Sequence, residues 1–111
     1  ELIMKLLIIY NTHAGHKRSG KIRSAIQSAL TQKELSADIL VTERRWHGMD
    51  LVEQADLSIY QGVIANGGDG TLFEVINGYF RNPGDNKPPI GLIPTGTGNA
   101  FARDLGLLGF E

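Results

Sequence analysis

The run Gly67-Gly68-Asp69-Gly70-Thr71 combines the residue types that bind a phosphate group and a metal ion. Three glycines in four residues let the backbone adopt positive φ and leave no Cβ in the way, so that N–H groups can converge on one ligand. The run also stands directly before an amphipathic segment, and the N-terminus of a helix favours a phosphate. Asp69 offers a carboxylate for a metal ion or a hydroxyl proton, and Thr71 offers a hydroxyl. We therefore interpret the run as a nucleotide-triphosphate site.

A plain structural turn is the alternative for an isolated run of this kind, with glycines at positive φ and Asp69 capping the following helix. A second glycine turn, at residues 94–99 (PTGTGN), argues against this alternative, because it too joins an apolar run to an amphipathic segment. Two anion-binding turns on one edge of a sheet favour a single ligand between them.

The apolar pattern predicts the elements that position both turns. Continuous β-branched and leucine runs are typical of strands buried on both faces of a parallel sheet. Apolar residues that recur at intervals of three and four indicate helices. The expected strands cover residues 6–10, 37–42, 63–65 and 90–93. The expected helices cover residues 21–32 with Ser19 as N-cap, 49–59, 72–80 and 100–105, and residues 81–89 form a turn-rich loop.

Strands that alternate with helices predict a three-layer α/β domain, with a mainly parallel sheet flanked by helices on both faces. In such sheets ligands bind at the carboxyl ends of the strands. The loops that follow the four expected strands are all polar, and three of them contain glycine. We therefore expect the functional site at this edge of the sheet.

The composition excludes several other classes of protein. Eleven basic against twelve acidic residues give a net charge of −1, which supplies no broad attraction to nucleic acid or to an anionic membrane, although a local basic patch is compatible with it. There is no cysteine, which excludes a disulfide framework and a thiolate metal site. The apolar run at residues 6–10 is too short to span a bilayer. We expect a cytoplasmic domain that binds no nucleic acid.

These motifs together resemble the nucleotide-binding half of the diacylglycerol kinase and sphingosine kinase family of lipid kinases, over about residues 6–106. The resemblance rests on Asn11 with Ala14-Gly15, on the 67–71 loop followed by Glu74, Val75, Asn77 and Gly78, and on residues 94–102. The stretch at residues 42–45 followed by His47, together with Ala100, resembles the sphingosine kinase branch in particular.

The resemblance implies a phosphofructokinase and NAD kinase-like fold, and a Mg²⁺-dependent transfer of the γ-phosphoryl group of ATP to a lipid hydroxyl. The acceptor would be a diacylglycerol or a sphingosine-like long-chain base. By resemblance, Asp69 holds magnesium or takes the acceptor proton, and both roles stay open because phosphoryl transfer mainly needs positioning and charge neutralisation. The resemblance assigns the ATP phosphates to Gly67, Gly68, Gly70 and Thr71, further nucleotide contacts to Asn11, His13, Thr42 and Glu74 (the last at the ribose), and the cleft between phosphate and acceptor to Thr97, Gly98 and Asn99.

The sequence departs from the family pattern in two places. In the first loop Thr12 stands where proline is usual, and His13 stands where arginine is common, histidine being a weaker and pH-dependent phosphate partner. The family also carries a C-terminal β-rich domain that closes the lipid pocket, and no part of these 111 residues corresponds to it. We expect residues 1–111 to be the ATP-binding domain of a longer two-domain enzyme, inactive alone, peripheral to the membrane that supplies the lipid, with homodimerisation through an uncovered apolar patch as an option.

Two other functions compete with the lipid kinase. NAD kinases and phosphofructokinases share the Gly-Gly-Asp-Gly-Thr loop, but the second turn of this sequence does not match the NAD kinase pattern. A nucleotide-binding module without chemistry of its own is the other alternative. Arg44-Arg45 and Trp46 likewise have two interpretations, as an ordinary surface loop or as a contact with lipid headgroups and the membrane.

Overall fold

The computed structural model describes residues 5–11, 19–94 and 103. Within them, four parallel strands form one sheet in the order β2-β1-β3-β4. The strands are β1 (Lys5–Asn11), β2 (Ser36–Thr42), β3 (Gly62–Asn66) and β4 (Ile90–Ile93). The helices are α1 (Ser19–Gln32), α2 (His47–Gln54), the 3₁₀ helix η1 (Leu57–Ile59) and α3 (Asp69–Arg81). The expected α/β fold with a parallel sheet is confirmed, and each described strand lies within one residue of its expected bounds.

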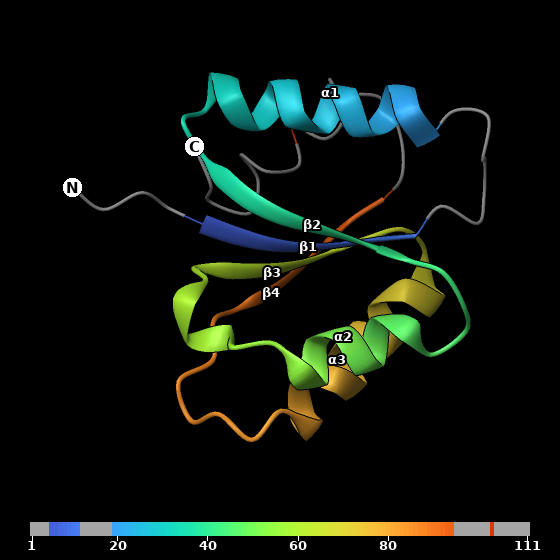
Figure 1. Cartoon of the computed structure of the whole chain (residues 1–111), viewed down its shortest axis with the longest axis vertical. Helices are drawn as coiled ribbons and strands as arrows, with labels where there is room; N and C mark the ends of the chain where they lie inside the picture. The colour runs from blue at the N-terminus through green and yellow to red at the C-terminus, as the bar shows by residue number, and fades with distance from the viewer. Residues whose placement is uncertain (1–4, 12–18, 95–102, 104–111) are drawn as a thin grey trace.

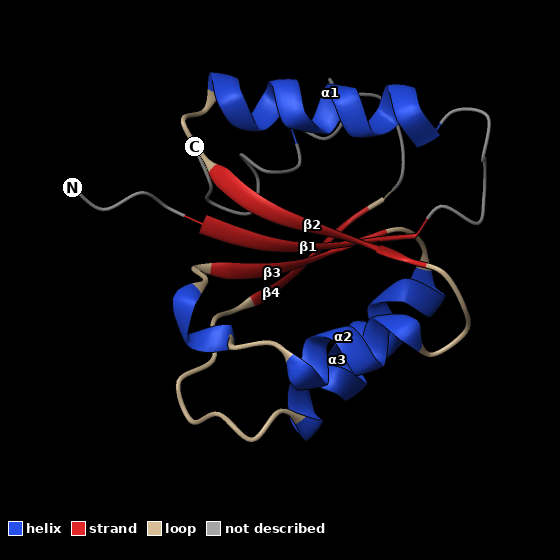
Figure 2. Cartoon of the chain, in the orientation of Figure 1, coloured by secondary structure: helices blue, strands red, loops and turns tan. Residues whose placement is uncertain are grey.

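Helices cover both faces of the sheet (Figures 1 and 2), with α1 on one face and α2, η1 and α3 on the other. Alternate residues of β1 serve the two sides, because side chains of a strand point to opposite faces. Leu6 and Ile8 pack in one core with Ile26 and Leu30 of α1. Leu7 and Ile9 pack in the other core with Val52, Val63 and Val75, among other residues. This double burial explains why β1 is a continuous apolar run.

The prediction of a single helix over residues 49–59 is wrong. Helix α2 ends at Gln54, Ala55 has extended backbone with φ −76° and ψ 151°, and η1 begins only after Asp56. The Asn82 side chain lies at this break, where its Nδ2 donates to the carbonyl oxygens of Val52, Glu53 and Ala55 at 3.0, 3.1 and 2.8 Å. A side chain that follows α3 therefore terminates α2.

Helix α3 begins earlier than the expected residue 72. Its N-cap is Gly68, so that Asp69 and Gly70 belong to its first turn. Near its other end α3 packs closely on α2, since a Cβ on Gly78 would collide with the backbone oxygen of Met49 and lie 2.9 Å from Val52 Cβ. Likewise α1 begins at Ser19 itself.

The expected helix over residues 100–105 lies outside the described residues apart from Arg103, which is helical. In the described ranges, no helix combines the length and the apolar character that a membrane span requires.

Candidate functional site

The carboxyl ends of β1 and β3 form the switch point of the sheet. These strands are neighbours, with β2 beyond β1 and β4 beyond β3. After β1 the chain continues to α1 on one face, whereas after β3 it continues to α3 on the opposite face (Figure 1). In open parallel sheets, ligands bind where consecutive connections diverge in this way. The register pairs Tyr10 with Asn66, which places Asn11 level with Gly67.

Three of the expected site residues meet at this point. The Asn11 amide Nδ2 donates to the Thr71 hydroxyl at 3.2 Å, and the Thr71 side chain is buried, with 5% exposure. Gly67 lies beside this pair, because a Cβ there would be 2.5 Å from Thr71 Oγ1 and 3.4 Å from Asn11 Cβ. The Gly67 N–H donates to the Ile93 carbonyl at 3.1 Å. The loop after β3 is thus fixed to both neighbouring strands.

The glycines of the loop are not needed for positive φ, and that expectation is wrong. Gly68 has φ −97°, and neither Gly67 nor Gly70 lies in the left-handed region. A Cβ at position 68 or 70 would meet nothing within 4 Å, so both positions border open space, and glycine leaves the backbone there uncovered. Leu72 N makes the first backbone hydrogen bond of α3, to Gly68 O at 3.1 Å, and the N–H groups before it have no partner within the helix. An anion can therefore come close to the exposed backbone N–H groups of this turn.

Asp69 is the first residue of α3, and its side chain is exposed. The N-cap is Gly68 without a side-chain cap, so the alternative in which Asp69 caps the helix is wrong. Among the residues that the structure describes, the Asp69 carboxylate has no hydrogen bond or ion pair. The same part of the chain contains no cluster of three or more histidines, aspartates or glutamates that could hold a metal ion.

Glu74 stabilises the start of α2. Its Oε2 accepts from Trp46 N and its Oε1 from Gly48 N, both at 3.0 Å. Trp46 is the N-cap of α2, in the left-handed conformation with φ 68°, and makes no side-chain cap of its own. A carboxylate at a helix N-terminus interacts favourably with its unpaired N–H groups. Sequence reasoning missed this contact between α3 and α2, and the ribose contact expected of Glu74 stays a prediction.

Thr42 ends β2, opposite Asn11 in the register, so it lies on the same edge of the sheet. Its hydroxyl is 3.5 Å from the Tyr10 carbonyl, to which it donates. The loop that follows is fastened by the Glu43 N–H, which donates to His47 Nδ1 at 2.9 Å. The remaining expected site residues, His13, Thr97, Gly98 and Asn99, lie outside the described residues.

Asn66 is a buried polar residue at this edge that sequence reasoning missed. Its side chain is 1% exposed, and Nδ2 donates to the Ile93 carbonyl at 2.9 Å, the same oxygen that accepts from Gly67. Its Oδ1 is buried without a hydrogen-bond partner among the described residues. The available signal was an asparagine at the end of an apolar run, directly before the first glycine of the loop.

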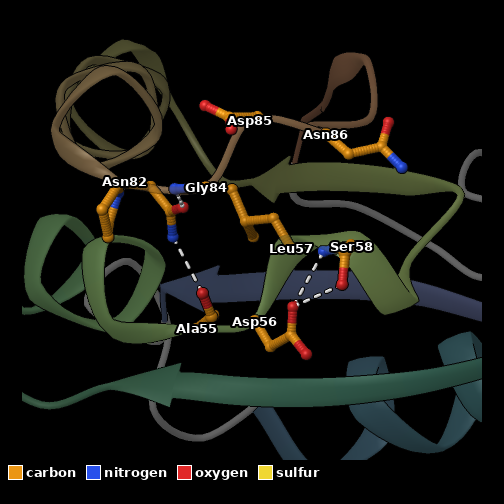
Figure 3. A pocket seen from close by; sticks show the side chains of 9 residues that line it. Ala55, Asp56, Leu57, Ser58, Asn82, Gly84, Asp85 and Asn86 are labelled. Atoms are coloured by element: carbon orange, nitrogen blue, oxygen red, sulfur yellow. Dashed lines mark hydrogen bonds between the residues drawn. The ribbon is translucent and has the colours of Figure 1, made fainter.

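A hollow of about 410 Å³ lies at the opposite, amino edge of the sheet (Figure 3). It is lined by residues 55–58 before β3 and 82–86 before β4. Two of its polar side chains stabilise the fold: Asn82 donates to Ala55 O and accepts from Gly84 N, and Asp56 Oδ1 accepts from the Ser58 backbone and hydroxyl at 3.1 and 2.6 Å. We therefore place the functional site at the carboxyl edge.

Comparisons with known proteins show the family of the chain. The diacylglycerol kinase catalytic domain family matches residues 5–110. The chain is 31% identical over 105 residues to human sphingosine kinase 1 and 36% identical over 100 residues to a diacylglycerol kinase of Bacillus subtilis. These alignments cover 91% and 90% of this chain but only 27% and 32% of the two relatives.

The fold has a close counterpart among solved structures. A diacylglycerol kinase from Bacillus anthracis str. Sterne superposes with a TM-score of 0.74 at 26% identity, over 98% of this chain and 40% of that chain. The expected phosphofructokinase and NAD kinase-like architecture is thereby confirmed. With the family match extending over nearly its whole length, the chain belongs to the diacylglycerol kinase catalytic domain family.

Proposed function

We propose that this chain is the nucleotide-binding part of a cytoplasmic lipid kinase, which transfers the γ-phosphoryl group of ATP to the hydroxyl of a diacylglycerol or a sphingosine-like long-chain base. The kinase family supports phosphoryl transfer in general. The observation that carries the proposal is the exposed first turn of α3 at the switch point. Its backbone is open at Gly68 and Gly70, and the Asp69 carboxylate has no partner among the described residues.

The first turn of α3 would hold the phosphates of the nucleotide. The N–H groups before Leu72 have no partner within the helix, and the helix N-terminus carries a partial positive charge. Because Gly68 and Gly70 lack a Cβ, a phosphate can approach these N–H groups without steric hindrance. The hydrogen bond from Asn11 to Thr71 joins this turn to the end of β1.

Magnesium is the metal that fits this edge. Mg²⁺ retains several waters and is commonly bound by one or two carboxylates together with substrate phosphates, which matches the exposed Asp69 carboxylate, a group without a partner among the described residues. Once bound, Mg²⁺ neutralises charge on the transferred phosphoryl group. Asp69 itself would hold the ion or accept the proton of the acceptor hydroxyl.

The test is Asp69→Asn in the full-length protein, with Asp85→Asn as the matched control, since both carboxylates are exposed but only Asp69 is at the carboxyl edge. We expect turnover with MgATP and lipid to fall by roughly a hundredfold or more in Asp69→Asn. The Tm should not change, because no contact within the described fold is lost. Near-normal turnover would contradict the assignment of Asp69.

A nucleotide-binding module without turnover is the second candidate for these 111 residues taken alone. The observation that favours it is coverage, because the chain spans less than a third of the two curated relatives named above. Calorimetric titration with MgATP, beside kinase assays on lipid and on NAD, separates the candidates. Binding without turnover supports the module, and phosphorylation of NAD instead of lipid contradicts the proposed acceptor.

A further inference from the structure

Asn66 is a polar residue in an apolar row of the sheet. Alternation of side chains along β3 places it on the α1 face together with Ile64, which belongs to the apolar core there. In the register Asn66 lies between Tyr10 of β1 and Ile93 of β4, and all three are buried. Packing alone would favour an apolar side chain at position 66. The amide therefore needs another explanation.

The Asn66 side chain joins the ends of β3 and β4, which lie side by side (Figure 1). Its Nδ2 donates to Ile93 O at 2.9 Å, and Gly67 N donates to the same oxygen at 3.1 Å. A carbonyl oxygen has two lone pairs, so these two donors use its whole capacity. Ile93 is the last residue of β4, and Gly67 is the first residue after β3. The two bonds thus fix the points at which both strands leave the sheet.

The other end of the amide has an energetic cost. Asn66 Oδ1 is buried and has no hydrogen-bond partner among the described residues. Rotation of the amide by half a turn would not relieve this cost, because Oδ1 would then face Ile93 O. A buried polar atom without a partner destabilises a fold, and without the amide Ile93 O would still accept from Gly67 N. For stability alone, an apolar side chain of similar shape would be as good at position 66.

We propose that Asn66 is a positioning residue of the nucleotide site, whose amide serves the placement of the loop after β3 and not the stability of the fold. It acts through Ile93 and Gly67, because it holds the carbonyl oxygen to which Gly67 N donates. Gly67 precedes Gly68, the N-cap of α3, and hence the N–H groups proposed to hold phosphate. Small displacements in a site of phosphoryl transfer reduce its function strongly. The inference rests on the proposed function for the identity of the ligand.

Asn82 shows what an amide that stabilises the fold looks like in this protein. Its Nδ2 donates to three carbonyl oxygens, and its Oδ1 accepts from Gly84 N. Loss of such a side chain should lower the Tm. Asn66 is bonded at one end of its amide only, so its loss should leave the Tm unchanged and affect the ligand instead.

The first experiment compares Asn66→Leu with the unmodified full-length protein by thermal denaturation and by calorimetric titration with MgATP. We expect a Tm equal to or above that of the unmodified protein, because the unpartnered oxygen is removed together with one hydrogen bond. The Kd for MgATP should rise by roughly tenfold. Ile64→Leu is the matched control, since it places a leucine on the same strand and the same face, and its Kd should equal that of the unmodified protein.

Asn66→Asp keeps the shape of the side chain and makes its donor depend on pH. The protonated carboxyl group can donate to Ile93 O as the amide does, whereas the ionised group cannot. The ratio of the Kd of this variant to that of the unmodified protein should therefore rise by roughly tenfold between about pH 5 and about pH 9. The ratio cancels protonation of the nucleotide and of Asp69. Tyr10, opposite in the register, keeps its proton in this range, because burial raises the pKa of its hydroxyl from 10.0 and Arg23 opposes this only in part.

Several outcomes would overturn the proposal. They are a lower Tm or an unchanged Kd in Asn66→Leu, an equal rise of the Kd in Ile64→Leu, and a Kd ratio of Asn66→Asp that does not change with pH. Absence of MgATP binding by the unmodified protein would overturn the proposed function as well. Equal binding by the unmodified protein and Asn66→Leu would remove the positioning role alone, so the two failures are distinguishable.

Discussion

At the amino edge of the sheet Tyr60, Asp38 and Asn82 bond to other groups of the protein, whereas at the carboxyl edge the Asp69 carboxylate and one atom of Asn66 have no partner among the described residues. The Tyr60 hydroxyl donates to Asp38 Oδ2 at 2.6 Å, and Lys5 Nζ lies 3.3 Å from the same oxygen. At the other edge Asn66 Oδ1 is buried without a partner in the described part of the chain, and the backbone of the first turn of α3 is open at Gly68 and Gly70.

The difference indicates that the two edges of the sheet have different roles. Polar groups that bond to one another stabilise the fold, but they have few free donors or acceptors for a ligand. Unpaired polar groups cost stability unless something else bonds to them. Substitutions at the amino edge should therefore change the free energy of unfolding, and substitutions in the first turn of α3 should change ligand binding instead.

The largest expected effect on stability is at the amino edge. Asn82→Leu removes an amide that donates to three carbonyls at the end of α2 and accepts from Gly84 N at 2.9 Å. We expect the free energy of unfolding to fall by about 3 kcal/mol, because buried backbone groups lose their partners. Urea denaturation measures this. The control is Asn86→Leu in the same hollow, where the side chain is exposed, and an equal loss there would contradict the explanation.

One substitution made at both ends of α3 sharpens the comparison. Gly78→Ala should destabilise by about 2 kcal/mol, because the new Cβ collides with the backbone of α2. Gly70→Ala meets open space and should leave stability unchanged or raise it by about 0.5 kcal/mol through helix propensity. In MgATP titrations Gly70→Ala should nevertheless weaken binding. Similar destabilisation by both substitutions in urea would contradict the finding that a Cβ at position 70 meets no other atom.

Glu74 is a residue at the carboxyl edge that can break the comparison, because it bonds to the protein itself. Glu74→Gln replaces one of the two oxygens that accept from Trp46 N and Gly48 N, and should cost about 1 kcal/mol. The measurement is urea denaturation beside nucleotide titration, with Glu53→Gln on α2 as control. Lost nucleotide affinity at unchanged stability would favour the ribose contact over the cap.

The smallest expected effect is the pH dependence of the pair at the amino edge. Burial, then the hydrogen bond to Asp38, raises the pKa of Tyr60 to about 12 from 10.0. The contribution of Tyr60 to the free energy of unfolding is therefore complete below pH 10 and is lost as the pH approaches 12. The Tyr60 hydrogen bond lowers the pKa of Asp38 from 3.8, so its stabilisation is present above that pH and is lost below it.

Thermal denaturation of the unmodified protein and of Tyr60→Phe across the pH range tests this pair. The difference in Tm should be constant at neutral pH and should shrink at both extremes. A difference that grows with pH above 10 would contradict the assigned direction.

The strands were predictable and the ends of the helices were not. Each strand is a run of apolar residues, and burial on both faces marks such a run without knowledge of its neighbours. The break between α2 and η1 was not predictable, because Asn82 lies 27 residues beyond the Ala55 carbonyl that it bonds to. The early start of α3 was missed because glycines suggested a loop, although Gly70 is helical.

The sequence by itself determined the alternation of strands and helices, and with it the edge on which the glycine loop must lie. Local apolar periodicity carries that information. Only the tertiary structure decided which polar groups bond within the protein and which are free to bind a ligand. The strand order brings Asn11 to Thr71, 60 residues apart, and Glu74 to Trp46, 28 residues apart. Hydrogen bonds of this kind depend on positions in space that no local pattern specifies.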